Sequence, residues 1–391
     1  MTEHVLMVGS TASMIKQFNQ RNIKLLQEQG YSVIVAANFA QPGTISEEAA
    51  VDLRESLENQ GVTVVNISFG RGMGSLRGNI VALKELNLIF KEYKITFVHV
   101  HSALASILTR VVALLKGVPV LYTVHGFQFT KNGSRLRWLA FFPVEWAFSF
   151  ITKRFIVIND EDEKIITKMF WSKSKVSRIN GVGIELEKFK PLTLDKKAKL
   201  REKLHLSNET KIFLTVAELS ARKNQEFVIR NLARVASQKW QYILVGNGSA
   251  EKQLRALAIN LGISDRVVFL GYREDVADFF GIADYGIYMS KLEGLLTAGM
   301  ESLASGVPLI GSDVRGIKDL ISDEHNGYLI TPPYEDNFIR ILNEVLVQDD
   351  SEYEGMRLNS VKSAKGYDKR LIDAQMLGIY QDFREEITGG K

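Results

Sequence analysis

The chain has 391 residues, of which 46% are hydrophobic and 24% are charged, and its net charge at neutral pH is +4. This length suggests two domains of roughly 150 residues or more each, and the composition is typical of a globular protein with packed cores. The near-balance of charges gives no reason to expect a nucleic-acid partner. The absence of cysteine excludes disulfides and thiolate metal sites, and it fits a reducing compartment such as the cytoplasm. The start, MTEHVLMVGS, lacks the basic segment of a signal peptide, and no apolar run reaches the roughly 18 residues of a transmembrane helix.

Strands and helices alternate along the first half of the chain. Short runs that are apolar throughout predict strands at residues 5–8, 32–36, 62–69, 97–100, 119–124, 155–158 and 176–179. Helical periodicity predicts one helix that ends near residue 29 and further helices at residues 46–59, 75–93 and 103–116. Apolar strands that take turns with helices are typical of a doubly wound parallel sheet, which is buried on both faces.

A polar, lysine-rich stretch at residues 188–205 separates this half from the second and is predicted to be a linker. The alternation then restarts. Strands are predicted at residues 211–216, 242–245, 267–270, 285–289 and 307–310. Helices are predicted at residues 225–238, 251–261, 336–347 and 368–384. We therefore expect a second α/β domain of the same kind.

The stretch SKLEGLLTAGMESLASGVPLIGSD, residues 290–313, joins two of these predicted strands through a short helix. Thr297 is the predicted N-cap of that helix, and Gly306 is predicted to follow its C-terminus. The backbone N–H groups at the helix start would favour an anionic phosphate. Glu293 and Glu301 flank this position, although a glutamate near a helix start is also favoured by the helix dipole alone.

This stretch resembles the E-x7-E signature of retaining family-four glycosyltransferases, which runs E-G-x-x-x-x-x-x-E-A-M-A-x-G-x-P. The matching positions are Glu293, Gly294, Glu301, Gly306 and Pro308, with Ser302-Leu303-Ala304 in place of Ala-Met-Ala. The resemblance implies a GT-B fold, in which two Rossmann-like, doubly wound parallel-sheet domains face a cleft. It implies an acceptor-binding domain at residues 1–190, a nucleotide-sugar-binding domain at 191–366, and a C-terminal helix at 367–391 that returns to the N-terminal domain.

A second element of the family, G-R-L-x-x-x-K-G, resembles residues 216–224, VAELSARKN. Lys223 matches the lysine that holds the donor diphosphate, and a cation beside phosphates is chemically sensible. Glu218 stands where the family has arginine, and we expect Arg222 to compensate. The alternative is that Arg222 and Lys223 are solvated surface charges.

Further similarities extend the predicted nucleotide-sugar site. Gly246 lies in a V-G-x-G turn, and Arg273 lies in a segment similar to F-x-G-x-x-x-D-V. The resemblance implies that Glu301 binds ribose hydroxyls and that Leu296 and Thr297 offer backbone amides to the diphosphate. It also implies that Glu293 binds a hydroxyl of the donor sugar.

The N-terminal half contributes histidines at the ends of two predicted strands. His99-Val100-His101-Ser102 and His125-Gly126-Phe127 resemble the H-x-H-T/S and T-x-H-G-F motifs of polysaccharide-assembling members. His99 and His101 alternate to the same face of a strand, but no third ligand is placed nearby, so we reject a metal site and expect activity without metal or other cofactor. By resemblance, His125 reaches the donor sugar or phosphate. We predict that Ser10, His101 and Arg71 lie on the acceptor side.

Residues 131–154, KNGSRLRWLAFFPVEWAFSFITKR, combine aromatic side chains with basic residues from Lys131 to Arg154. Pro143 argues against one straight buried helix. Aromatic and basic residues together favour binding to a membrane interface. The alternative is that the aromatic side chains belong to the core of the N-terminal domain.

These observations predict a retaining glycosyltransferase with Lys223, Glu293 and His125 as catalytic residues. By resemblance, it transfers a sugar from a UDP-sugar to a polyprenyl-diphosphate-linked saccharide, in bacterial exopolysaccharide, capsule or O-antigen synthesis. We expect it at the cytoplasmic face of the membrane as a peripheral protein. Two alternatives stay open: a nucleotide-sugar 2-epimerase of the same fold, and a non-catalytic protein that binds sugar nucleotides or membrane.

Overall fold

The computed structural model describes residues 3–389 except 71, 73, 132, 205, 208, 236 and 238. The chain divides into unit 1, Met1–Val182 with Arg370–Lys391, and unit 2, Gly183–Lys369. The sequence placed the boundary at residues 190 and 191. The structure assigns 183–190 to unit 2, where the backbone of Ile184 bonds to that of Tyr367 and Lys369.

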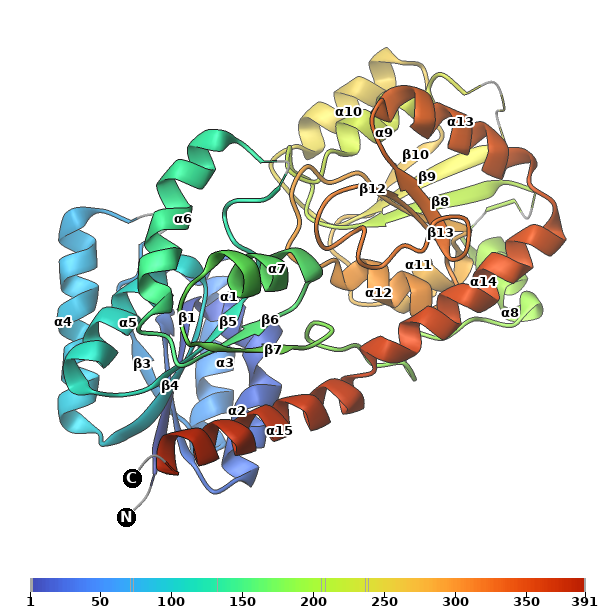
Figure 1. The fold of residues 1–391 in the computed structure, drawn as a ribbon. Helices are drawn as coiled ribbons and strands as arrows, with labels where there is room; N and C mark the ends of the chain where they lie inside the picture. Colours follow the sequence, from blue (N-terminus) through green and yellow to red (C-terminus); the bar gives the residue numbers. More distant parts are fainter. Residues whose placement is uncertain are drawn as a thin grey trace. The chain divides into compact units, whose positions relative to one another are not determined.

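Unit 1 contains a seven-stranded, all-parallel sheet of order β3-β2-β1-β4-β5-β6-β7 (Figure 1). Its strands are β1 (His4–Thr11), β2 (Ser32–Asn38), β3 (Thr63–Asn66), β4 (Ile95–His101), β5 (Val120–Val124), β6 (Arg154–Val157) and β7 (Lys175–Arg178). The strand order reverses direction between β1 and β4. In open α/β sheets, ligands bind beyond the carboxyl ends of the strands at such a switch point.

The helices of unit 1 alternate with its strands, and some of them begin at side-chain caps. The helices are α1 (Ala12–Met14), a π-helical turn (Ile15–Asn19), α2 (Gln20–Glu28), α3 (Glu47–Asn59), α4 (Leu76–Glu92), α5 (Ala103–Lys116), α6 (Arg135–Ser149), α7 (Asp160–Met169) and α15 (Lys369–Thr388). The side chains of Ser46, Ser75 and Asn159 accept backbone N–H bonds at the starts of α3, α4 and α7. Such caps satisfy donors that the first helical turn leaves unpaired.

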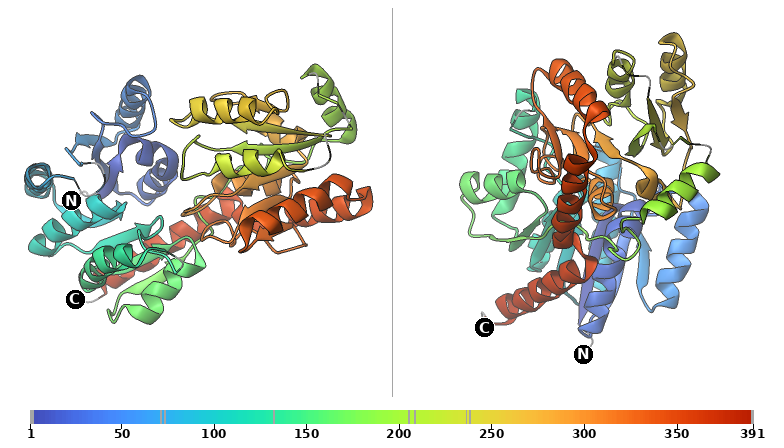
Figure 2. Two further views of the ribbon diagram at one scale, coloured as in Figure 1. Left: turned by 90° about the horizontal axis from the view of Figure 1, so that it is seen from above. Right: turned by 90° about the vertical axis from the view of Figure 1, so that its right-hand side faces the viewer.

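The two faces of the first sheet pack against different helices. Leu6 and Val8 of β1 belong to one core with residues of α4 and α5. On the opposite face, Phe97 of β4 contacts the rings of Tyr380 and Phe383 of α15. Figure 2 shows α15, in dark red, running alongside the rest of unit 1. The period-two alternation of buried side chains thus explains why the strands are apolar on both faces.

Unit 2 contains a six-stranded parallel sheet of order β10-β9-β8-β11-β12-β13. Its strands are β8 (Lys211–Val216), β9 (Trp240–Val245), β10 (Val267–Phe269), β11 (Tyr285–Tyr288), β12 (Leu309–Ser312) and β13 (Gly327–Ile330). Its helices are α8 (Leu194–Lys203), α9 (Gln225–Leu232), α10 (Glu251–Asn260), α11 (Val276–Ile282), α12 (Thr297–Ala304), α13 (Tyr334–Val347) and α14 (Asp350–Ala364), followed by a 3-10 turn at Lys365–Tyr367.

Most of the predicted linker is a helix that is bonded to the second sheet. The side chain of Thr193 caps α8, and two cations of this helix bind one buried carboxylate of the sheet. Lys197 Nζ lies 2.8 Å from Asp284 Oδ1, and Arg201 Nη2 lies 2.7 Å from Asp284 Oδ2. Opposite charges compensate each other's desolvation. The lysine-rich composition therefore reflects ion pairing within unit 2.

The helix α6 runs continuously through Pro143, which the sequence predicted to interrupt it. A proline inside a helix removes one N–H bond and crowds the carbonyl four residues earlier. That carbonyl belongs to Leu139, a residue that is 75% exposed. Water can therefore solvate the carbonyl group. Among the described residues, no helix combines the length and the apolar character needed to span a membrane.

Candidate active site

Two loops of unit 2 are joined at the carboxyl edge of its sheet. They follow the neighbouring strands β8 and β11. Lys291 donates its backbone N–H to the carbonyl of Arg222 at 2.9 Å. Asn224 Nδ2 donates to the carbonyl of Met289 at 3.0 Å, and Arg222 Nη1 donates to the carbonyl of Leu292 at 3.2 Å. These bonds hold Lys223 and Glu293 next to each other.

The charged side chains of the two loops form one cluster. Lys223 Nζ lies 2.5 Å from Glu293 Oε2, and Arg222 Nη1 lies 3.4 Å from Glu293 Oε1. Glu293 and the Lys223 side chain are largely shielded from water, whereas Arg222 and Glu218 are more exposed. Glu218 Oε2 lies 3.7 Å from Arg222 Nη2, so the carboxylate that departs from the family pattern pairs with the arginine expected to replace it.

The helix α12 begins beside this cluster. Its first residue is Thr297, and its N-cap is Leu296, so the prediction that Thr297 is the N-cap was wrong. Leu296 is buried in an apolar core, which fixes the helix start by packing. The first N–H groups of any α-helix lack intrahelical partners and carry a partial positive charge. Gly306 has φ +72° directly after the C-cap, as predicted.

Glu301 lies in the second turn of α12 and is mostly buried. Burial raises the pKa of its carboxyl to about 7, and the nearby charge of Lys188 acts in the opposite direction. A carboxyl group with this pKa changes its charge close to neutral pH. It can accept hydrogen bonds from hydroxyl groups when ionised and can also donate one when protonated.

Two further predicted binding residues occupy different environments. Gly246 has φ +136°, and a Cβ atom there would lie 2.0 Å from the carbonyl oxygen of Ala217. The turn therefore needs glycine because two backbone segments meet. Arg273 is exposed and forms a bidentate pair with Asp275, its Nε lying 2.8 Å from Asp275 Oδ1. Its guanidinium also lies over the ring of Phe279.

Sequence reasoning did not assign a site role to two buried residues that contact Glu293. Arg315 donates from Nε to the carbonyl of Glu293 at 3.3 Å. Ser290 places its hydroxyl 3.4 Å from Glu293 Oε2. The sequence signal was the position of each residue shortly after a strand, two residues after β11 for Ser290 and three after β12 for Arg315, where parallel sheets gather ligand-binding groups.

In unit 1, three histidines at the ends of β4 and β5 lie in a row, with the ring of His101 in contact with those of His99 and His125. The rings of His99 and His101 are 4.2 Å apart, which confirms that both face the same side of β4. His99 bonds to Tyr380 Oη and to Thr123 Oγ1, each at 2.8 Å. Both of its ring nitrogens are thus engaged within the protein, and its role is structural.

His101 and His125 bond to each other, with 2.9 Å between Nδ1 of His101 and Nε2 of His125. Burial lowers the pKa of His125 to about 4 and that of His99 to about 3, and it holds the pKa of His101 well below its usual value. All three are therefore neutral near pH 7. Within the part of the chain that the structure describes, no three His, Asp or Glu side chains are arranged to hold a metal ion.

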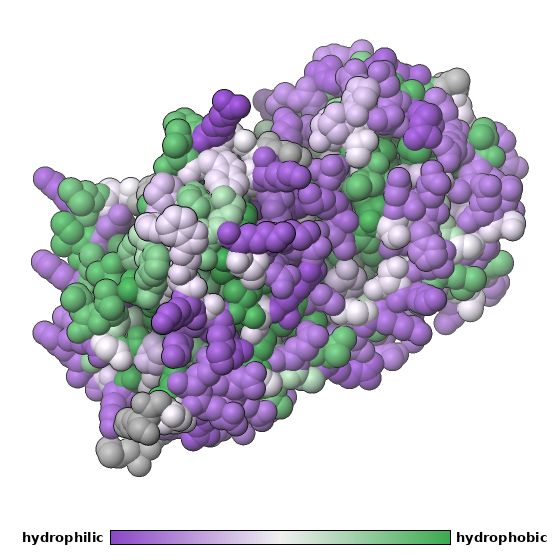
Figure 3. Space-filling view, viewed as in Figure 1, coloured by the Kyte–Doolittle hydropathy of each residue, from purple (hydrophilic) through white to green (hydrophobic). Residues whose placement is uncertain are grey.

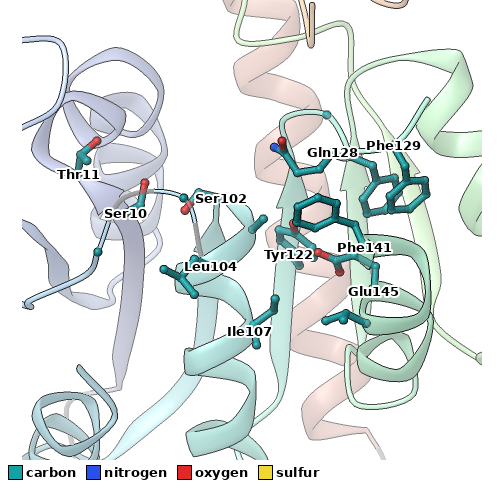
Figure 4. A pocket seen from close by; sticks show the side chains of 16 residues that line it. Ser10, Thr11, Ser102, Leu104, Ile107, Tyr122, Gln128, Phe129, Phe141 and Glu145 are labelled. Carbon is teal, nitrogen blue, oxygen red and sulfur yellow. The ribbon is translucent and has the colours of Figure 1, made fainter. Parts of the chain in front are cut away.

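A pocket of about 340 Å³ lies at the carboxyl edge of the same sheet (Figure 4). Its lining includes Ser10, Ser102, Tyr122, Phe141 and Glu145. Figure 4 shows Ser10 and Ser102 on one side of the pocket and the aromatic residues on the other. Ser10 is one of the predicted acceptor-side residues. Arg71, another of them, lies outside the described residues.

Comparison with known proteins matches each of the two units to a protein-family model. The family model described as Glycosyltransferase Family 4 matches residues 20–186, and the model described as Glycosyl transferases group 1 matches residues 196–362. An Escherichia coli protein named UDP-Gal:alpha-D-GlcNAc-diphosphoundecaprenol alpha-1,3-galactosyltransferase is 32% identical over 73% of this chain and 74% of its own length. The chain belongs to the family-four, group 1 glycosyltransferases.

Other relatives of this glycosyltransferase share most of its length. EpsD of Bacillus subtilis (strain 168), whose assignment as a glycosyltransferase is provisional, is 29% identical over 84% of each chain. The fold is GT-B. The crystal structure of Anabaena Alr3699/HepE in complex with UDP and glucose matches with a TM-score of 0.76 at 18% identity, covering 97% of this chain and 100% of that one. The enzyme is thus a GT-B glycosyltransferase related to bacterial enzymes that act on lipid-linked saccharides.

The raised pKa of Glu301 predicts how the stability of this glycosyltransferase depends on pH. The carboxyl titrates near pH 4.5 in the unfolded chain and near 7 in the folded one, so the folded state holds the extra proton between these values. This group therefore stabilises the fold at low pH, and its contribution is lost as the pH rises through 7. Replacing Glu301 by Gln removes the titration.

We expect the unfolding free energy of the wild type, minus that of Glu301→Gln, to fall by roughly 3 kcal/mol between pH 4 and pH 8. Urea unfolding of both proteins across this range measures the difference. Glu55→Gln, at an exposed residue of α3, is the control, since it removes a carboxylate outside the site and should give a nearly constant difference. A pH-independent difference for Glu301→Gln would show that the carboxyl keeps an ordinary pKa.

Proposed function

We propose that this enzyme transfers a sugar from a UDP-sugar to a saccharide on a polyprenyl diphosphate, with retention of the anomeric configuration, in bacterial surface polysaccharide synthesis. The observation that carries the proposal is the cluster of Lys223, Arg222 and Glu293 at the start of α12. The names of two relatives support the acceptor. One is the Escherichia coli enzyme described above, and the other is an N,N'-diacetylbacillosaminyl-diphospho-undecaprenol alpha-1,3-N-acetylgalactosaminyltransferase of Campylobacter jejuni, 24% identical over 68% of this chain.

The donor fits the charges of unit 2. A nucleotide diphosphate is anionic. Lys223 and Arg222 supply cations to it, and the first backbone amides of α12, whose start is marked by Leu296 and Thr297, supply N–H donors. Glu301 then accepts hydrogen bonds from the ribose hydroxyls. We assign uracil to the base because a structural neighbour contains UDP.

Catalysis would rest on stabilising the departing diphosphate, whose negative charge grows in the transition state. Glu293 shares its carboxylate with Lys223 and Arg222, which lowers its nucleophilicity. We therefore assign Glu293 to a sugar hydroxyl and to the positioning of Lys223, and we do not assign it to a covalent intermediate. The acceptor attacks from the face that the diphosphate leaves, and a phosphate oxygen takes its proton. His125, neutral at pH 7, contacts the donor sugar or phosphate.

The test is transfer from radiolabelled UDP-sugars to an undecaprenyl-diphosphate saccharide, with the product anomer read by NMR. Lys223→Ala should lower kcat by roughly 10²–10³-fold with a smaller change in the donor KM, because the lysine acts mainly on developing charge. Lys239→Ala, which removes an exposed lysine paired with Glu209 elsewhere in unit 2, is the matched control and should leave kcat unchanged. A pure KM effect for Lys223→Ala would restrict this lysine to ground-state binding.

We also propose that the transfer needs no metal ion, because Lys223, Arg222 and helix amides supply the positive charge that a metal would bring to the diphosphate. Activity should then persist after dialysis against EDTA. Complete loss of turnover that Mg²⁺ or Mn²⁺ restores would contradict this proposal.

The membrane contact that we propose is formed by helices of unit 1. Figure 3 shows hydrophobic side chains gathered over α4 and α5, beside α6. The exposed apolar residues of these three helices are Leu76, Ile80, Val81, Leu88, Leu114, Leu115, Leu136 and Leu139. Exposed apolar area of this kind, with basic neighbours such as Arg135 and Arg137, favours an anionic lipid surface.

Two details differ from the sequence-based picture of the 131–154 stretch. Trp138 and Trp146 are partly buried against the core, and Trp138 Nε1 bonds to the carbonyl of Thr130 at 2.7 Å. Leu136 and Leu139 are the apolar residues exposed on α6. Arg154 is buried, at 6% exposure, and pairs with Glu386 of α15, so it does not contribute to lipid binding.

Sedimentation with anionic phosphatidylglycerol liposomes at low salt tests this surface. Wild type should pellet with the vesicles, and the double variant Leu136→Gln/Leu139→Gln should stay mostly in the supernatant because it loses apolar contact. Val347→Gln/Leu358→Gln, which changes two equally exposed apolar residues of unit 2, is the control and should pellet like wild type. Wild type that stays in the supernatant would refute membrane binding.

A further inference from the structure

The pocket of unit 1 lies between a helix that carries exposed apolar side chains and the carboxyl edge of the sheet. Phe141 and Glu145 of α6 line it, and so does Ile107 of α5. Its volume of about 340 Å³ is in the range of ligand sites. No residue of the donor cluster contributes to it, since all of its lining belongs to unit 1.

The charged groups of the pocket wall are paired with each other, whereas the buried Ser102 Oγ on its polar side has no hydrogen-bond partner among the described residues. Glu145 Oε2 lies 2.8 Å from Arg110 Nη2, and neither side chain is appreciably exposed. Arg110 also donates to Ser106 Oγ at 2.8 Å, and its guanidinium lies 4.7 Å from the centre of the Tyr122 ring. The charges inside the wall are thus neutralised before any ligand enters.

This wall suits an apolar ligand better than a saccharide. Hydroxyl groups that leave water without new partners cost about 1–3 kcal/mol each in proteins. An alkyl chain gains free energy in proportion to the apolar area that it buries. Leu104, Ile107, Phe127, Phe129 and Phe141 supply such area around the pocket.

The polar side of the pocket indicates the orientation of the ligand. Ser10, Thr11 and Ser102 lie together opposite Phe141 and Tyr122 in Figure 4. An amphiphile would therefore place its polar head beside the hydroxyl groups and its chain among the aromatic residues. The same helix α6 also carries the exposed side chains of Leu136 and Leu139, which offer apolar surface for the rest of a long chain.

We propose that this pocket binds the isoprenoid chain of the acceptor, in the segment next to its diphosphate. The proposal rests on the proposed function, because it takes the lipid-linked acceptor as given. It adds that the enzyme recognises the lipid itself and that the bilayer does not hold the whole chain. Acceptors with a truncated isoprenoid should then be poorer substrates even in detergent solution, where no membrane contributes.

Binding of geranyl diphosphate, compared with inorganic diphosphate, tests the pocket without any sugar or turnover. In calorimetry, wild type should bind geranyl diphosphate about tenfold more tightly than inorganic diphosphate, a difference in binding free energy of about 1.4 kcal/mol. Ile107→Trp fills the pocket and should reduce the affinity for geranyl diphosphate to that of inorganic diphosphate. Val51→Trp places the same side chain at an exposed residue of α3, 55% exposed and away from the pocket and the proposed membrane surface, and should behave like wild type.

Equal affinity of wild type for the two probes, or an unchanged preference in Ile107→Trp, would overturn the proposal. UDP affinity and thermal unfolding of both variants should match wild type, and Val144→Phe provides a second, milder filling of the pocket if Ile107→Trp does not fold. The outcome is separable from that of the proposed function. Failure of sugar transfer with intact geranyl binding refutes the function, whereas normal transfer with no geranyl preference refutes the pocket.

Discussion

The proposed donor site of this glycosyltransferase depends on the contact between the loops that follow β8 and β11. Lys223 and Glu293 are 70 residues apart in the sequence, yet their charged atoms are 2.5 Å apart because the two strands are neighbours in a parallel sheet. Backbone bonds between the loops fix this contact, and the ion pair compensates the desolvation of both charges. A diphosphate that binds here meets cations that are already held in place, so little reorganisation is needed when charge develops.

The two units offer opposite chemistry at their sheet edges. Unit 2 presents Lys223, Arg222 and a helix start, which suit an anionic nucleotide diphosphate. Unit 1 presents neutral histidines and an apolar pocket whose charges, Arg110 and Glu145, cancel each other. This division fits a reaction between a soluble, charged donor and an amphiphilic acceptor. The bond between His99 and Tyr380 also ties the C-terminal helix α15 to the histidines of unit 1.

Much of this arrangement could be predicted from the sequence, because it depends on local patterns. Apolar runs located the strands of both sheets except β13 (Gly327–Ile330), which was not predicted, and the E-x7-E spacing placed Glu293 before α12 and Glu301 within it. Contacts between distant residues could not be predicted in the same way. The α8 helix was mistaken for a linker because its lysine and arginine bind Asp284, more than 80 residues away. Arg154 was assigned to the membrane because nothing local indicates that Glu386 neutralises it.

The central claim is that the edge of the second sheet binds a nucleotide diphosphate through Lys223 and α12, with Glu301 on the ribose. Calorimetric titration of UDP into wild type and Glu301→Ala at pH 8, where this carboxyl is ionised, tests it most directly. The account predicts that the variant binds UDP about 1–3 kcal/mol more weakly, or about 5- to 150-fold, since a charged hydrogen bond is lost. Equal UDP affinity in a folded Glu301→Ala protein would contradict it.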